Sequence, residues 1–288
     1  MKVIVIGGSG FLGSHIADAL SENGHTVRIF DCKLSPWLQE SQEMIVGDIQ
    51  DVDAVRSAIT DCEIVFHYAG VSDLNYALAH PVETANINVM GTLNVLEACR
   101  SENVKRIIFA SSLYALSDAG GFYRWSKASC EDLIEEYQRR FGVNYTILRY
   151  GSLYGPRSDS TNGLHRIVSE AFSTGSIRYS GSSDTLREYI YVSDAAQFSI
   201  DTLGEKFENQ AVIISGHQSM KVTDVLHLVS EILGNTVTVE FLDERYEAHY
   251  VRTPYSYRDR TALKYTPTLH TDIGQGILRL IEDIKRNK

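Results

Sequence analysis

Short runs of apolar, largely β-branched residues alternate with segments of helical period over the first 150 residues of the chain. Strands are expected at Lys2–Ile6, Thr26–Phe30, Glu43–Val46, Ile64–Tyr68, Arg106–Ala110 and Asn144–Arg149. Helices are expected between them at Leu12–Asn23, Ala54–Ala58, Glu83–Ser101 and Gly121–Phe141. Successive strand and helix units of this kind predict an α/β fold, a doubly wound parallel sheet with helices on both faces.

The pattern becomes less regular after Tyr154-Gly155-Pro156, where stretches rich in Gly, Ser and Asp begin. Helices are expected near Leu164–Ser173, Val222–Leu233 and Asp272–Arg286, and an aromatic and basic stretch runs from Tyr250 to Arg260. The chain has no internal repeat and no linker that is long and polar enough to separate independent domains.

Composition narrows the class of protein. Of 288 residues, 43% are hydrophobic and 22% charged, which is typical of a soluble globular chain. The net charge of −10 gives no general attraction to nucleic acid or to an anionic membrane. No apolar run is long enough for a transmembrane helix, and the short one at the N-terminus is shorter than a signal-peptide core. The four cysteines form no CxxC pair, so we expect no metal site, no disulfide framework and a reducing cytoplasm.

A glycine-rich loop joins the first expected strand to the first expected helix. It reads Gly7-Gly8-Ser9-Gly10-Phe11-Leu12-Gly13. Glycines there allow a tight turn, close approach of the backbone to a pyrophosphate, and close packing of helix on strand, while the helix N-terminus offers unpaired N–H groups to phosphates. Any strand-to-helix turn can be glycine-rich, so this loop alone is a weak signal of dinucleotide binding.

Asp31 strengthens the prediction that the glycine-rich loop binds a dinucleotide. It ends the second strand 18 residues beyond Gly13, near the spacing of about 20 expected for an acid that binds the ribose diol. With Cys32 beside it, Asp31 predicts NAD rather than NADP, because a carboxylate repels a 2′-phosphate; Lys33 weakens this preference slightly. Asp48 and Ile49 follow the third strand, where adenine would lie.

The end of the fourth strand is a further candidate for the cofactor site. Tyr68, Ala69 and Gly70 occupy it, although taken alone it is an ordinary strand-end turn. The neighbouring His67 is more often a core histidine than a catalyst.

The candidate reactive centre is formed by Ser112, Tyr123 and Lys127. Ser112 closes the strand that begins at Arg106, and Tyr123 and Lys127 lie four residues apart at the start of a long helix. That spacing puts both on one helix face, so the ammonium can lower the pKa of the phenol from about 10 towards the working pH. Lys127 could also bind the nicotinamide ribose, and Ser112 could hold the oxygen whose proton Tyr123 removes. A bare Tyr-x-x-x-Lys often marks only a solvated helix face.

Together these features make the chain resemble the extended short-chain dehydrogenase/reductase family, the NAD-dependent epimerases and dehydratases of nucleotide sugars. The resemblance covers essentially the whole chain. Beyond the glycine loop and the Tyr/Lys pair, it rests on the segments 88–92 (NVMGT), 148–157 (LRYGSLYGPR) and 187–194 (REYIYVSD).

The resemblance implies roles for further residues. Asn88 would lie near the cofactor, the backbone at Tyr150 and Gly151 would face the nicotinamide, and Arg187 would bind the substrate diphosphate. Without the resemblance, Arg187 is simply an arginine beside Glu188, most often part of a surface ion pair. Ser72 and Ser152 are further candidates for substrate binding, with Ser112.

The resemblance also implies a division of the chain and an assembly. Residues 1–155 would form the NAD-binding Rossmann domain, with segments near 186–216 returning to it, and 156–288 mainly a smaller α/β lobe that binds the nucleotide sugar. A homodimer would form through the helices near 83–101 and 123–141, whose apolar residues equally suit an internal core.

Three positions depart from the pattern of the family. Ser112 and Tyr123 are only 11 residues apart, where sugar-nucleotide members usually have a longer loop, and Ser152 stands where the family often has Asn. Leu113-Tyr114 stands where dehydratases of 4-keto sugars carry an Asp-Glu pair as acid and base, so a 4,6-dehydratase is disfavoured.

The resemblance and these residues leave three functions open. The leading prediction is oxidation at C4 of a nucleotide-diphosphate sugar by a 4-epimerase that returns the hydride to the other face of the sugar. The alternative is a 4-dehydrogenase that releases the keto sugar, for example from a GDP-manno-heptose. A non-catalytic dinucleotide sensor is the third, although such a protein would be expected to have lost the tyrosine or the lysine.

Overall fold

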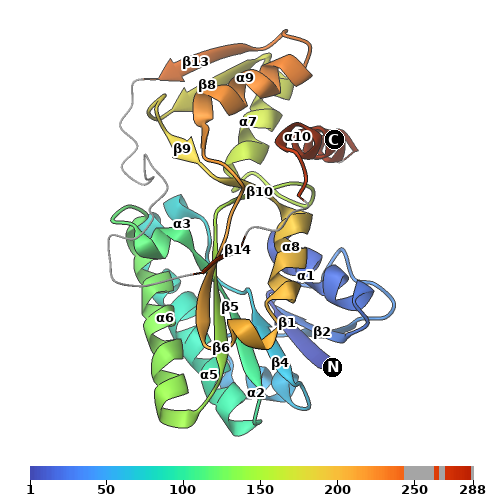
Figure 1. Ribbon diagram of the computed structural model, residues 1–288, viewed down its shortest axis with the longest axis vertical. Helices are drawn as coiled ribbons and strands as arrows, with labels where there is room; N and C mark the ends of the chain where they lie inside the picture. The colour runs from blue at the N-terminus through green and yellow to red at the C-terminus, as the bar shows by residue number, and fades with distance from the viewer. Residues whose placement is uncertain (243–262, 266–269, 287–288) are drawn as a thin grey trace.

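A parallel sheet of eight strands lies at the centre of the larger part of the computed structural model, which describes residues 1–242, 263–265 and 270–286 (Figure 1). Its strands are β1 (Lys2–Ile6), β2 (Thr26–Asp31), β3 (Glu43–Val46), β4 (Ile64–His67), β5 (Arg106–Ser112), β6 (Tyr145–Tyr150), β11 (Gln210–Ile214) and β14 (Leu263–Tyr265). The spatial order is β14-β11-β6-β5-β4-β1-β2-β3, and every pair is parallel. The chain thus winds outward from β1 in both directions.

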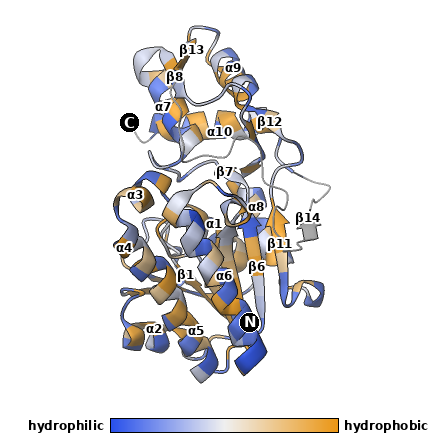
Figure 2. Cartoon of the chain, turned by 90° about the vertical axis from the view of Figure 1, so that its left-hand side faces the viewer, coloured by the Kyte–Doolittle hydropathy of each residue, from blue (hydrophilic) through white to orange (hydrophobic). Residues whose placement is uncertain are grey.

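Helices cover both faces of this sheet, which confirms the predicted doubly wound fold. On one face are α1 (Phe11–Glu22) and α8 (Val192–Asp201); on the other are α2 (Val52–Ile59), α5 (Gly91–Ser101) and α6 (Gly121–Phe141). Val3 and Val5 of β1 pack on the first face, whereas Ile4 and Ile6 pack on the second. Both faces of a parallel strand are therefore buried, and the continuous apolar runs in the sequence follow from that (Figure 2).

The expected helix Glu83–Ser101 differs in detail from the observed segment. Helical backbone begins with α4 (Pro81–Thr84), passes through a π-helical segment at Ala85–Met90, and continues as α5. The buried residue of the π-helical segment is the polar Asn88, so apolar periodicity does not reveal the wider turn.

Several other predicted bounds shift by one or two residues. Strand β5 extends to Ser112, whereas β4 ends at His67 rather than at Tyr68. The short helix α3 (Leu74–Ala79) was not predicted; Asp73 caps it by accepting a hydrogen bond from the backbone N–H of Tyr76.

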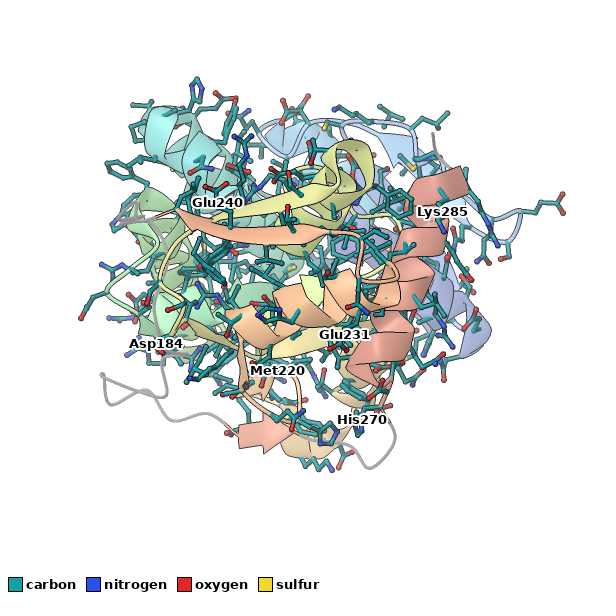
Figure 3. The ribbon with its side chains drawn as sticks, turned by 90° about the horizontal axis from the view of Figure 1, so that it is seen from above. Asp184, Met220, Glu231, Glu240, His270 and Lys285 are labelled. Carbon is teal, nitrogen blue, oxygen red and sulfur yellow. The ribbon has the colours of Figure 1, made fainter. Side chains whose placement is uncertain are left out.

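A smaller part stands above the carboxyl ends of the strands (Figures 1 and 3). Its elements are α7 (Gly163–Thr174), β8 (Ser176–Ser180), β9 (Leu186–Arg187), β12 (Met220–Lys221), α9 (Val222–Ile232), β13 (Thr238–Leu242) and α10 (Ile273–Arg286). The three helices bury one stripe each in a shared core; in α10 the stripe is Ile277, Leu280, Ile281 and Ile284. These helices match the three predicted in the second half to within one residue at each end.

The chain passes between the two parts repeatedly. Strand β7 (Ser152–Tyr154) pairs with β10 (Tyr189–Tyr191) at the junction, and α8 and β11 then return to the large sheet. The stretch from Tyr250 to Arg260 lies outside the described residues. No helix in the described part of the chain is long and apolar enough to cross a membrane.

A buried ion pair fixes α6 to the sheet. Glu131 of α6 accepts hydrogen bonds from Arg149 Nε at 3.0 Å and Nη2 at 2.8 Å, and from Ser111 Oγ at 2.5 Å. The side chains of Glu131 and Arg149 are 0% and 1% exposed. The carboxylate therefore joins α6, β5 and β6 at one point.

Glu131→Ala is expected to lower the free energy of unfolding by about 3–5 kcal/mol, because it leaves the Arg149 guanidinium buried without its counter-ion. Denaturant unfolding measures the loss. Glu136→Ala is the matched control, since Glu136 lies on the same helix and pairs with Arg139 and Arg140 at the surface. Equal losses in the two variants would contradict the central role of Glu131.

Candidate active site

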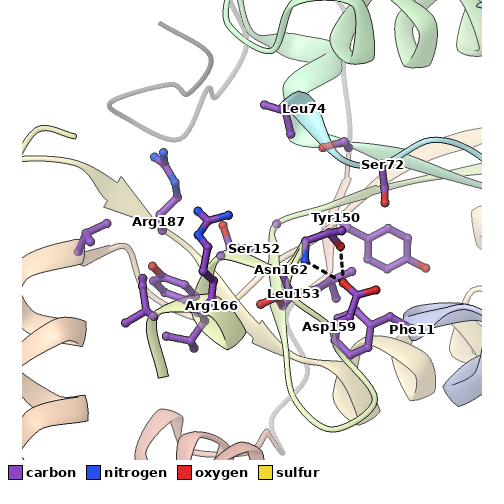
Figure 4. A pocket seen from close by; sticks show the side chains of 18 of the residues that line it. Phe11, Ser72, Leu74, Tyr150, Ser152, Leu153, Asp159, Asn162, Arg166 and Arg187 are labelled. Carbon is purple, nitrogen blue, oxygen red and sulfur yellow. Dashed lines mark hydrogen bonds between the residues drawn. The ribbon is translucent and has the colours of Figure 1, made fainter. Parts of the chain in front are cut away.

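A cavity of about 800 Å³ lies between the two parts of the molecule (Figure 4). Its walls include both predicted catalytic and predicted substrate-binding residues: Ser72, Ser112, Tyr123, Tyr150, Gly151, Ser152 and Arg187. Gly10 and Phe11 of the glycine loop line it as well. A cavity at the carboxyl ends of parallel strands is where α/β proteins bind ligands.

The glycine loop has the tight geometry that its sequence suggests. Gly7 adopts φ +85°, and a Cβ atom there would come within 2.4 Å of the Ala69 nitrogen. A Cβ on Gly13 would come within 2.1 Å of the Gly7 carbonyl oxygen, so the first turn of α1 packs directly on the loop. A Cβ on Gly10 would make no such clash, because its one contact within 4 Å would be the Gly7 carbonyl oxygen at 3.4 Å. Gly10 thus leaves open space beside the helix N-terminus.

Hydrogen bonds to the Asp31 carboxylate hold this loop against the end of β2. Its Oδ2 accepts a hydrogen bond from the Ser9 backbone N–H at 3.0 Å, and its Oδ1 accepts one from the Lys33 N–H at 3.1 Å. Ser9 Oγ donates to the Lys33 carbonyl at 2.8 Å. The carboxylate is half-buried beside the loop, at the place where the sequence predicts a ribose acceptor.

Tyr123 and Lys127 lie on the face of α6 that is turned to the sheet. Tyr123 is 8% exposed and lines the cavity, and the Lys127 ammonium lies 6.0 Å from the centre of its ring. Lys127 Nζ donates to the Ala110 carbonyl at 2.8 Å, and burial lowers the pKa of this amine below its usual value. Ser112 ends β5 at the same cavity and accepts a hydrogen bond from the Tyr114 N–H at 3.3 Å.

Comparison with known proteins agrees with this arrangement. Residues 3–215, well over half of the chain, match the NAD dependent epimerase/dehydratase family. The chain belongs to that family. Its cofactor is accordingly NAD, and its architecture is that of an extended short-chain dehydrogenase/reductase.

Two curated relatives and one solved structure illustrate the similarity. A putative UDP-glucose 4-epimerase of Methanocaldococcus jannaschii is 28% identical over 99% of both chains. A UDP-N-acetyl-alpha-D-glucosaminuronate decarboxylase of Bacillus cytotoxicus is 26% identical over 98% of this chain and 97% of that protein. The crystal structure of UDP-glucose 4-epimerase from Thermotoga maritima with UDP-glucose has a TM-score of 0.87, with 25% identity, over 100% of this chain and 99% of that one.

The residues of this family member fit a dinucleotide along the loop. The space at Gly10 and the helix N-terminus suit a pyrophosphate, and Asp31 lies beside them. Further along the sheet edge, Cys32 and Asp48 are exposed, whereas Ile49 is buried in the core. An adenine contact from Ile49 would therefore come from its backbone.

Asn88 has its side chain fully engaged by protein groups. Its Oδ1 accepts from the Val71 N–H at 2.7 Å, and its Nδ2 donates to the Val71 carbonyl at 3.0 Å and to Ser126 Oγ at 2.9 Å. A Cβ on Gly70 would meet Asn88 Oδ1 at 2.8 Å. Asn88 therefore ties the loop after β4 to α6, and the structure places it beneath the predicted cofactor residues Tyr68, Ala69 and Gly70.

Tyr150 takes part in a buried chain of hydroxyl groups. Its oxygen lies 2.6 Å from that of Tyr68 and 2.6 Å from Ser199 Oγ, and Ser199 donates to the Ala195 carbonyl. Burial raises the pKa of both phenols above their usual value. These hydrogen bonds connect β6, the end of β4 and α8 next to Gly151, which lines the cavity.

Arg187 is 8% exposed and lines the cavity, so it is no surface arginine. Its neighbour Glu188 is buried and accepts hydrogen bonds from Ser215 and Ser219. The peptide N–H of Ser152 donates to the Glu188 carbonyl at 2.9 Å, which sets Ser152 at the junction.

Sequence reasoning missed several residues that line the cavity. They include Leu74, Tyr114, Leu153, Asp159, Thr161, Asn162, Arg166, Glu170, Arg178, Tyr179 and Tyr189. Asn162 had a readable signal, since it caps α7 by accepting a hydrogen bond from the His165 N–H at 3.1 Å. The two arginines had none, because they lie on an amphipathic helix and a short strand where a charged residue is ordinary.

Substitutions at Gly10 and Gly13 test two different properties, cofactor binding and the stability of the fold. Gly10→Ala is expected to leave thermal stability nearly unchanged but to weaken NAD binding by at least about tenfold, because the methyl group enters the space for the pyrophosphate. Gly13→Ala is expected to destabilise the folded chain itself, since its Cβ would clash with Gly7. Calorimetric titration and thermal unfolding measure both effects; NAD affinity of wild-type strength in Gly10→Ala would refute the placement.

His67 is a core residue, and its burial lowers its pKa to about 3. Its Nε2 lies 2.9 Å from Thr92 Oγ1. In the unfolded chain His67 binds a proton near pH 6.5, whereas in the folded chain it stays neutral. The contribution of the neutral His67 to the free energy of unfolding is therefore fully present above pH 6.5 and is lost as the pH falls towards 3.

His67→Gln is therefore expected to reduce the loss of stability between pH 7 and pH 5 by about 2 kcal/mol. Urea unfolding at the two pH values gives the difference within each variant. His80→Gln, at an exposed position, serves as the control and should leave the loss unchanged. An identical pH dependence in His67→Gln and the wild type would contradict the lowered pKa, because it would show that the folded chain protonates His67 as readily as the unfolded chain does.

Proposed function

We propose that this chain is an NAD-dependent 4-epimerase of a UDP-hexose. The observation that carries the proposal is the meeting of Ser112 and Tyr123 in one cavity, with the buried Lys127 ammonium 6.0 Å from the centre of the tyrosine ring. The named relatives with UDP-sugar activities support the choice of nucleotide.

Tyr123 acts as the general base. It takes the proton of the sugar 4-hydroxyl, and the Lys127 ammonium stabilises the phenolate form by its charge. Ser112 donates a hydrogen bond to the same sugar oxygen and holds it in place. NAD held by the glycine loop and Asp31 would supply the acceptor for a hydride from C4 and its source for reduction of the 4-keto sugar on the opposite face. Tyr123 then gives its proton back to the oxygen, so neither protons nor electrons are left over.

Three arginines line the other end of the cavity, where we place the diphosphate. Arg166 of α7, Arg178 of β8 and Arg187 of β9 all come from the smaller part of the molecule. Guanidinium groups match the oxygens of a diphosphate in charge and geometry. The smaller part would thus hold the nucleotide while the sheet supplies the chemistry.

The assembly belongs to the same proposal. Large apolar side chains are exposed on the side of the molecule that carries α3, α4 and α6, among them Leu78, Val82, Phe122 and Trp125. We propose that a homodimer covers them.

The first test mixes the purified protein with UDP-, GDP- and dTDP-sugars and follows the product by NMR and nicotinamide reduction by absorbance. We expect UDP-glucose to give its C4 epimer without lasting reduction of the cofactor. Lasting reduction with a 4-keto product would instead identify a 4-dehydrogenase and overturn the epimerase assignment.

Tyr123→Phe is expected to lower this turnover by about 10²-fold or more, because it removes the base, while NAD remains bound. Tyr76→Phe is the matched control, since Tyr76 is exposed on α3 and does not line the cavity. Near-normal turnover in Tyr123→Phe would exclude this residue as the base.

A further inference from the structure

We infer that Tyr114 is a specificity-determining residue that restricts the sugar to a neutral hexose and rejects one with a carboxylate. The inference rests on the proposed function and deepens it. It follows from how charge is distributed along the cavity and from how the Tyr114 ring is held.

Charge is divided between the two ends of the cavity. Arg166, Arg178 and Arg187 line the end formed by the smaller part, and Figure 4 shows Arg166 and Arg187 together on one side. The described residues that line the cavity around the candidate base carry hydroxyl, aromatic or aliphatic side chains: Ser72, Leu74, Ser112, Tyr114 and Tyr123.

The cation nearest to Tyr123 is the buried ammonium of Lys127. Lys127 is 6% exposed, and its ammonium donates to the Ala110 carbonyl beneath Tyr123. The carboxylates that line the cavity, Glu170 and Asp159, add negative charge; Glu170 pairs with Arg178 at 3.3 Å. The described residues that line the cavity around Tyr123 therefore offer a sugar no cationic partner.

The ring of Tyr114 is fixed beside the base. Ser112 Oγ accepts from the Tyr114 N–H, and Tyr114 is the half-buried member of a 3₁₀ turn, Leu113–Leu116, whose other members are buried. Gly120 adopts φ +98°, and a Cβ there would lie 2.6 Å from Tyr114 Cδ1, so the ring packs on bare backbone. Its centre lies 6.1 Å from that of Tyr123, with an angle of 73° between the rings.

An aromatic ring in this position favours a neutral sugar for two reasons. It offers an apolar surface to the C–H groups of a pyranose, and its π-face is electron-rich. It also excludes water from the space beside the sugar, and a carboxylate that loses its water without gaining a cation is strongly disfavoured. Tyr114 stands at the second of the two positions where dehydratases of the resembled family carry the acid–base Asp-Glu pair.

The experiment compares UDP-glucose with UDP-glucuronic acid in the wild type, Tyr114→Thr and Tyr114→Phe. Affinity for each sugar and for UDP alone is measured by calorimetry, and kcat/KM by NMR. We expect the wild type to prefer UDP-glucose by at least about 100-fold, and Tyr114→Thr to reduce that ratio by about tenfold, because water then reaches the carboxylate. Tyr114→Phe should keep the ratio, and UDP alone should bind equally to all three.

The possible failures differ from one another. If no UDP-sugar binds although NAD does, the proposed function is wrong and this inference falls with it. If UDP-glucose is epimerised but the wild type accepts UDP-glucuronic acid equally well, or if Tyr114→Thr leaves the ratio unchanged, the inference alone is wrong. Bound NAD in Tyr114→Thr shows that the variant is folded.

Discussion

The buried carboxylate of Glu131 is the point on which the geometry of the site depends. It binds the guanidinium of Arg149 from β6 and the hydroxyl of Ser111 from β5, and it lies one helical turn beyond Lys127. Ser111 precedes Ser112, and Arg149 precedes Tyr150. The three elements that carry the candidate chemistry are therefore fixed to one another by buried contacts, and on β5 and β6 the contacting residue is adjacent to one that lines the cavity.

The second constraint is the way in which the two parts of the molecule meet. Arg157, at the end of the Gly-Pro-Arg segment, pairs with Asp18 of α1 at 2.7 Å, and its backbone N–H donates to Asp283 of α10 at 3.1 Å. Its guanidinium also lies over the ring of Trp37, 4.8 Å from the centre. One residue thus holds the first helix, the loop after β2 and the last helix in a single arrangement around the cavity.

Local spacing explains which features could be predicted from the sequence. The glycine loop, Asp31 and the Tyr123/Lys127 pair each depend on neighbours within one strand, turn or helix, and the parallel order of β1 to β6 follows from their alternation with helices. Arg166, Arg178 and Tyr114 come from separate elements, and only the folded chain brings them to one cavity. Asn88 was placed near the cofactor by resemblance, but its hydrogen bonds to Val71 and Ser126 depend on a π-helical turn that apolar periodicity cannot reveal.

The repeated passage of the chain between the two parts has a consequence during synthesis on the ribosome. Strand β6 is completed early, but its outer neighbour β11 follows only after α7, β8, β9 and β10 have been made, and β14 follows after α9 and β13. One edge of β6 therefore stays open until β11 emerges, and an open edge of a parallel sheet invites pairing with other chains. During synthesis the growing sheet thus passes through a stage with an unpaired edge that the finished fold does not have.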